Sequence, residues 1–139
     1  MAKTSKGMWI GIGAAVLALV VIASVYLAPA MALRKKVVIG TKDEVFYSGN
    51  ATEQDARALG EALKGAGYFT DRGVSTTLAK ESDWTTISFV IQDDAWKDPN
   101  NVAAFGLIGR MVAPVVGDLP IRVRLTGSNL RTQKELYID

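Results

Sequence analysis

The chain of 139 residues contains no cysteine and no histidine. The absence of cysteine excludes disulfide bonds, thiol catalysis and cysteine-ligated metals. The absence of histidine excludes an imidazole base, histidine-ligated zinc or haem, and a histidine switch near neutral pH. Serines are present, but they lack the usual base, and there is no S-x-x-K motif. We therefore expect no catalytic residue, no cofactor, no metal and no enzymatic activity.

Positive charge in excess of negative charge is confined to the N-terminal end. The net charge is +2, and Lys3 and Lys6 account for it. The other fourteen Lys and Arg are balanced by fourteen Asp and Glu, all of which follow a long uncharged run. A formally neutral region lacks the basic footprint of nucleic-acid-binding proteins, so we do not expect nucleic acid as a partner.

The uncharged run extends from Met8 to Leu27. A helix rises about 1.5 Å per residue, so this run spans roughly the 30 Å hydrocarbon core of a bilayer. We predict a single retained transmembrane helix, with membrane lipid around it. A cleaved signal peptide is the alternative, with Ala28-Pro29-Ala30 as the cleavage site, but the run is longer than the usual apolar region of such peptides. The predicted organisation is a tail (1–7), a transmembrane helix (8–28), a linker (29–35) and one domain (36–139).

Small residues occupy one face of this predicted span, and such a face lets helices approach closely in lipid. These residues are Gly7, Gly11, Ala14, Ala15 and Ala18. We expect them to pack against another transmembrane helix or a flat cofactor, although Gly and Ala are also common in spans without such a role. The positive charges on the two sides of the span favour opposite orientations in the membrane, and the two effects are nearly equal. We place the domain on the periplasmic or extracytoplasmic side, since the N-terminal tail is short.

Hydrophobic periodicity predicts an α+β domain after the span. Thr52 and Asp55 fit a capping box at the start of one helix, and Asp98-Pro99 fits the start of another. The predicted strands cover residues 36–40, 45–48, 74–80, 84–92, 121–125 and 135–138, and the predicted helices cover 52–67 and 98 to about 114. Apart from the first and last strands, the order is β-α-β-β-α-β. This order predicts a ferredoxin-like fold, with both helices on one face of an antiparallel sheet and an extra N-terminal hairpin strand.

Two local motifs are better explained by structural roles than by metal binding or glycosylation. Asp93-Asp94 could supply oxygen ligands to a divalent cation, but only Asp98 is near in sequence, which favours a solvated loop. Asn50-Ala51-Thr52 fits a glycosylation sequon, but it adjoins the predicted helix start, so capping explains it better.

Alternation along the strands predicts one sheet face that carries aromatic and arginine side chains. Phe46 or Tyr47 is expected on the same face, beside these side chains. Trp, Tyr and Arg are typical anchors of protein interfaces, so we predict a docking face. The alternatives are a face covered by the first hairpin or the terminal strand, and base stacking on RNA. The predicted docking residues are Trp84, Thr86, Ser88, Arg122 and Arg124.

Five stretches after the span are VFYSG (45–49), ATEQDA (51–56), LGEAL (59–63), APVVG (113–117) and PIRVRL (120–125). Together they resemble a poorly characterised bacterial domain found at the soluble end of assorted membrane proteins, including some rhomboid-like ones. The resemblance covers about residues 36–134. It implies an accessory module and assigns no active site, because the chain lacks the multi-span catalytic body of a rhomboid.

These observations predict a non-catalytic, single-pass accessory or structural subunit. Its helix is expected to pack with other transmembrane subunits of a larger complex, for instance a respiratory or photosynthetic one, and its domain to dock on them. The alternative is a membrane-anchored sensor module that binds a small ligand or a peptide.

Overall fold

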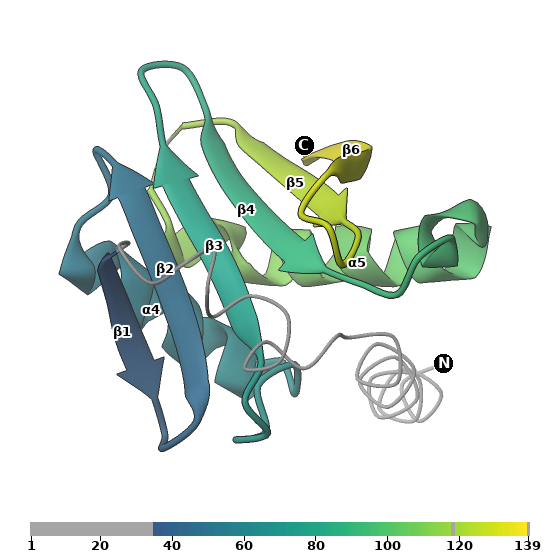
Figure 1. Ribbon diagram of the computed structural model, residues 1–139. Helices are drawn as coiled ribbons and strands as arrows, with labels where there is room; N and C mark the ends of the chain where they lie inside the picture. Colours follow the sequence, from purple (N-terminus) through teal and green to yellow (C-terminus); the bar gives the residue numbers. More distant parts are fainter. Residues whose placement is uncertain (1–34, 118, 139) are drawn as a thin grey trace, which may run out of the picture.

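The computed structural model describes residues 35–117 and 119–138 (Figure 1). The predicted transmembrane helix over residues 8–28, with its face of small residues, lies outside the described residues. Among the described residues, no helix is both long enough and apolar enough to cross a membrane.

Six strands and two α-helices make up the described part of the chain. The strands are β1 (Lys35–Ile39), β2 (Asp43–Gly49), β3 (Ser75–Lys80), β4 (Thr85–Val90), β5 (Ile121–Thr126) and β6 (Thr132–Ile138). The helices are α4 (Glu53–Gly65) and α5 (Pro99–Val112), with short 3₁₀ turns η1 (Ala95–Lys97) and η2 (Ala113–Val115) on either side of α5. Each predicted helix and strand is present within a few residues of its expected bounds.

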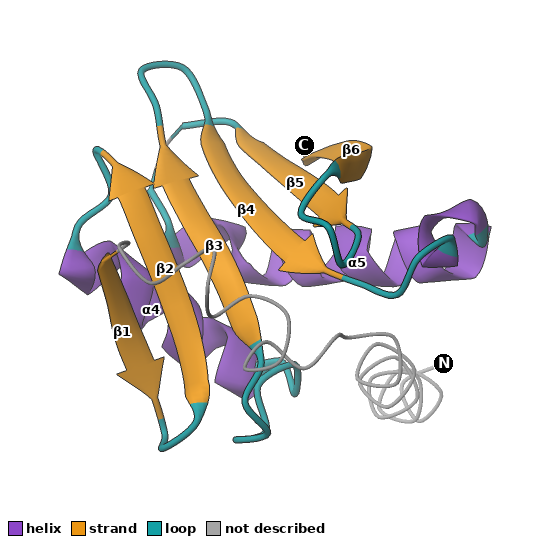
Figure 2. Ribbon diagram, in the orientation of Figure 1, coloured by secondary structure: helices purple, strands orange, loops and turns teal. Residues whose placement is uncertain are grey.

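The strands form one mixed sheet in sequential order, β1-β2-β3-β4-β5-β6. The pairs β2/β3 and β4/β5 are parallel, and each is connected by a helix. The other three pairs are antiparallel hairpins. Figure 2 shows both helices on the same side of the sheet, which leaves the opposite side, hereafter the open face, without a helix.

The predicted ferredoxin-like topology is wrong. In that fold β2 would lie between β4 and β5, within an antiparallel sheet. Here β2 pairs with β1 on one edge and with β3 on the other, and the sheet is mixed. Both edges of β2 that would pair with β4 and β5 in the ferredoxin-like order are instead paired with β1 and β3.

The two helical crossovers have opposite handedness. The parallel pair β2/β3 runs antiparallel to the pair β4/β5, because β3 and β4 form a hairpin. Both crossovers progress in the same direction across the sheet, and both helices pack on the same face (Figure 1). One crossover is therefore left-handed, which is rare for this motif.

Local sequence explains where the helices begin. The side chain of Thr52 accepts a hydrogen bond from the backbone N–H of Asp55, and the Asp55 carboxylate accepts one from the N–H of Thr52. This is the predicted capping box. The Asp98 side chain caps α5, and Pro99 occupies the first turn, where its missing N–H has no cost.

An aromatic cluster lies between the helices and the sheet. The ring centroid of Tyr68 is 5.0 Å from that of Phe89 and 6.3 Å from that of Phe105, in edge-to-face arrangements. Burial raises the pKa of Tyr68. The hydroxyl of Thr76 opposes this rise, although no hydrogen bond of good geometry joins either buried hydroxyl to the described residues. The weak contact between the two hydroxyls therefore offsets only part of their desolvation.

Two aspartates fasten the loop between α4 and β3 to the turn between β1 and β2. The buried carboxylate of Asp43 accepts hydrogen bonds from four consecutive backbone N–H groups, those of residues 71–74, at 2.6–3.1 Å. In return, Asp71 accepts hydrogen bonds from the hydroxyl and N–H of Thr41 and from the N–H of Lys42. The bonds from Thr41 hold the pKa of Asp71 below its usual value.

Candidate functional site

The predicted docking residues occupy two rows that cross the open face. In one row, Ser88 of β4 lies beside Arg124 of β5, and Arg124 lies beside Glu135 of β6. In the next row, Thr86 lies beside Arg122, and Arg122 lies beside Tyr137. Trp84 lies just before β4, and its ring contacts Arg122 and Tyr137 of the second row. The sheet therefore brings all five predicted residues together, because strand alternation is maintained across three paired strands.

Arg122 is the centre of the second row. Its guanidinium donates hydrogen bonds to the hydroxyl of Thr86 at 3.1 and 3.2 Å, and it lies 5.4 Å from the centroid of the Trp84 ring. One terminal nitrogen is 3.5 Å from the carboxylate of Glu81. These three contacts all come from the β4 side of β5, and together they restrict an arginine side chain that would otherwise be mobile.

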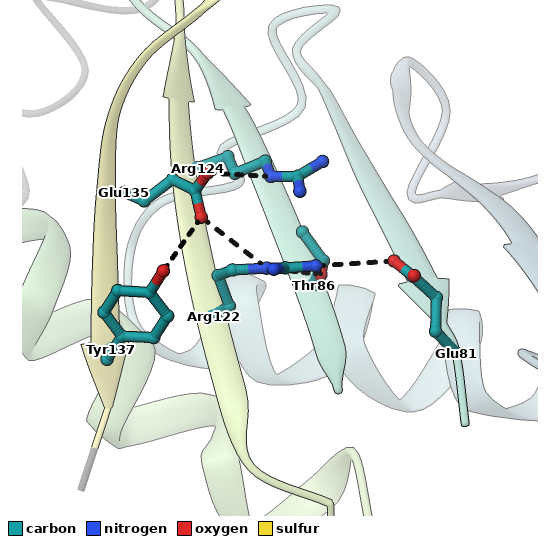
Figure 3. A network of polar contacts seen from close by, with 6 residues as sticks. All are labelled: Glu81, Thr86, Arg122, Arg124, Glu135 and Tyr137. Atoms are coloured by element: carbon teal, nitrogen blue, oxygen red, sulfur yellow. Dashed lines mark hydrogen bonds and ion pairs between the residues drawn. The ribbon is translucent and has the colours of Figure 1, made fainter. Parts of the chain in front are cut away.

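Glu135 links the two arginines (Figure 3). Its carboxylate oxygens lie 3.7 Å from Nε of Arg122 and 3.8 Å from Nε of Arg124, and the Tyr137 hydroxyl donates to it at 3.4 Å. Two arginines are thus balanced by two glutamates, Glu81 and Glu135. We call the group of Glu81, Trp84, Thr86, Arg122, Arg124, Glu135 and Tyr137 the arginine patch.

Aromatic side chains at the end of the patch are available for contact. The rings of Trp84 and Tyr137 meet edge to face, with their centroids 5.3 Å apart. Tyr137 is 60% exposed, the largest exposure among the large hydrophobic residues in the described part of the chain. A half-exposed aromatic pair beside a fixed guanidinium is a composition typical of interface anchors.

The open face excludes one alternative and differs from the prediction in two ways. Neither β1 nor β6 covers it, as the alternative had it, since both pair edge to edge within the sheet. Phe46 shares the face, but β3 separates it from the arginine patch, and Tyr47 packs against the core on the opposite face. Glu135 and Tyr137 were missed, although their period-two alternation with Leu136 and Ile138 would have placed them on this face once β6 was paired with β5.

Asp93 and Asp94, considered from the sequence as cation ligands, make local contacts instead. Asp93 accepts a hydrogen bond from the N–H of Ser128 at 3.4 Å, and Asp94 pairs with Lys97 at 3.2 Å. Within residues 35–117 and 119–138, no three His, Cys, Asp or Glu side chains are grouped so that they could hold a metal ion. Thr52 acts as a helix cap, the role favoured from the sequence over the sequon.

Comparison of the chain with protein-family models, with curated proteins and with solved structures finds no match. The similarity to a domain of rhomboid-like membrane proteins therefore stays a prediction, and the function is argued from the open face.

Proposed function

We propose that this chain is a non-catalytic accessory subunit of a membrane assembly, whose domain docks on a neighbouring protein subunit through the arginine patch. The observation that carries this proposal is the pair of Trp84 and the exposed Tyr137 beside two arginines, on a face that no described helix covers. The uncharged run over residues 8–28 supplies the membrane attachment in this proposal.

The charge of the patch supports a protein partner. Arg122 and Arg124 are balanced by Glu81 and Glu135 at 3.5–3.8 Å, so the patch has no excess positive charge. Nucleic acid and anionic lipid both require such an excess. A neutral surface of aromatic and paired charged groups instead fits a partner surface of mixed polarity, as protein interfaces have.

Site-specific photocrosslinking in native membranes tests the proposal. A photoreactive amino acid replaces Tyr137 in one variant and Glu61 in another; Glu61 is an exposed residue of α4, on the other side of the sheet. We expect one discrete protein adduct from position 137 and none from position 61. The variants Trp84→Ser and Tyr137→Ser should lose co-migration with that protein on native gels after mild solubilisation.

Equal crosslinking from the two positions would contradict docking through the patch. Migration of the wild-type chain as a lone monomer after mild solubilisation would contradict the accessory-subunit proposal itself. A variant that keeps its circular dichroism spectrum but loses the adduct separates loss of the interface from loss of the fold.

A further inference from the structure

A hollow of about 200 Å³ lies on the open face, next to the arginine patch. Its lining comes from four adjacent strands, β3 to β6, and from the loop between β5 and β6. The lining residues are Thr77, Ser88, Val90, Arg124, Thr126, Leu130 and Thr132. We call it the Arg124 hollow.

Arg124 presents its charged end to this hollow. Figure 3 shows its guanidinium extending from β5 over β4, away from Glu135. Only Nε faces the Glu135 carboxylate, at 3.8 Å, and the side chain is 34% exposed. Its two terminal nitrogens have no protein acceptor within the described part of the chain. A guanidinium whose two terminal nitrogens are free can bind an oxyanion through two parallel hydrogen bonds.

Hydroxyl groups line the same hollow as the guanidinium. Thr77 and Ser88 lie in the same row as Arg124, and Thr132 closes the hollow from β6. Their side chains make no hydrogen bonds to the described residues, so their hydroxyls are available as donors. The hydroxyl of Thr126 instead donates to the carbonyl of Phe89. The hollow thus combines one cation with three hydroxyl groups that make no hydrogen bond to the described residues.

The charge and the walls of the hollow select among oxyanions. Glu135 partly offsets the charge of Arg124, so a monoanion suits the hollow better than a doubly charged phosphate. Val90 and Leu130 supply apolar lining, which suits a short aliphatic group. We infer that the Arg124 hollow binds a small aliphatic carboxylate, with the carboxylate on Arg124 and the hydroxyls of Thr77 and Ser88, and the aliphatic part against Val90 and Leu130. This inference does not depend on protein docking.

Calorimetric titration of the full-length chain in a mild detergent tests the inference, with isovalerate as the probe. We expect a Kd of about 1–10 mM, as a ligand this small permits. The variant Arg124→Gln should weaken binding about tenfold or more, since it removes a charge-assisted bidentate contact. The matched control Arg57→Gln removes one positive charge from the exposed side of α4 and should leave the Kd unchanged.

Two further probes separate the ligand chemistries. Isovaleramide has a similar shape without the charge and should bind at least about tenfold more weakly than isovalerate. Inorganic phosphate should also bind more weakly than isovalerate. Tighter binding of phosphate would overturn the carboxylate assignment.

Equal affinity of the wild-type chain and Arg124→Gln for isovalerate, or no binding up to about 100 mM, would overturn the site itself. If Arg124→Gln fails to fold, Arg124→Lys and Ser88→Ala take its place. Lysine keeps the positive charge but lacks the planar set of N–H donors of arginine. An unchanged Kd in both of these variants would therefore equally overturn the inference.

Discussion

The carboxylate of Asp43 is expected to be the most sensitive polar group in the described part of the chain. It is 1% exposed and accepts four backbone N–H groups, with Oδ1 accepting three of them and Oδ2 one. These bonds hold the loop that leads from α4 into β3. Substitution of Asp43 therefore tests whether this loop depends on a single side chain.

The magnitude follows from the environment of the four donors. In Asp43→Ala the N–H of Val74 stays buried without a partner, which costs about 1–3 kcal/mol. The three donors of residues 71–73 are partly accessible to water, and each loses about 0.5–1 kcal/mol. The expected total is a loss of about 3–5 kcal/mol. Asp43→Asn keeps an oxygen for the three donors of Oδ1 and should lose about 1–2 kcal/mol.

Equilibrium urea unfolding of the full-length chain, followed by circular dichroism, measures these losses as changes in the free energy of unfolding. Glu44→Gln is the matched control, because the neighbouring carboxylate makes only a surface ion pair with Lys36. It should change stability by less than about 1 kcal/mol. A loss below about 1 kcal/mol in Asp43→Ala, or a larger loss in Asp43→Asn than in Asp43→Ala, would refute the reasoning.

Three further predictions follow from the core and the loops. Tyr68→Phe removes a buried hydroxyl whose contact with Thr76 is too poorly aligned to offset its desolvation, so the variant should be as stable as the wild type or up to about 1 kcal/mol more stable by urea unfolding. Gly60→Ala places a methyl group against Ile39 and should cost about 1–2 kcal/mol despite the higher helix propensity of alanine, whereas Gly65→Ala meets no atom within 4 Å and should not destabilise. Because the pKa of Asp71 is lowered in the folded state, its contribution is complete above the unfolded pKa of about 3.9 and disappears as pH falls through the folded value. Between about pH 5 and pH 2, Asp71→Asn should therefore lose less stability than the wild type in acid titrations of the melting temperature, and equal slopes would contradict the hydrogen bonds assigned to Asp71.

The candidate docking surface was only partly predictable. Alternation along β4 and β5 correctly grouped Trp84, Thr86 and Arg122 on one face, because successive side chains of a strand point to opposite faces. The same rule could not supply Glu135 and Tyr137, since their place beside the arginines depends on which strand pairs with β5. Their role as a docking surface stays a prediction until crosslinking tests it.

The amino-acid sequence by itself determined which segments form helices and strands, and where the two helices begin. The capping box of Thr52 and the first turn at Pro99 are local interactions, completed within a few residues along the chain. Strand order, the mixed pairing and the opposite hands of the crossovers were decided by tertiary structure alone. These features depend on hydrogen bonds between strands far apart in the sequence, and one element order is compatible with more than one such pairing. The Arg124 hollow likewise exists only because four strands and a loop meet around one guanidinium.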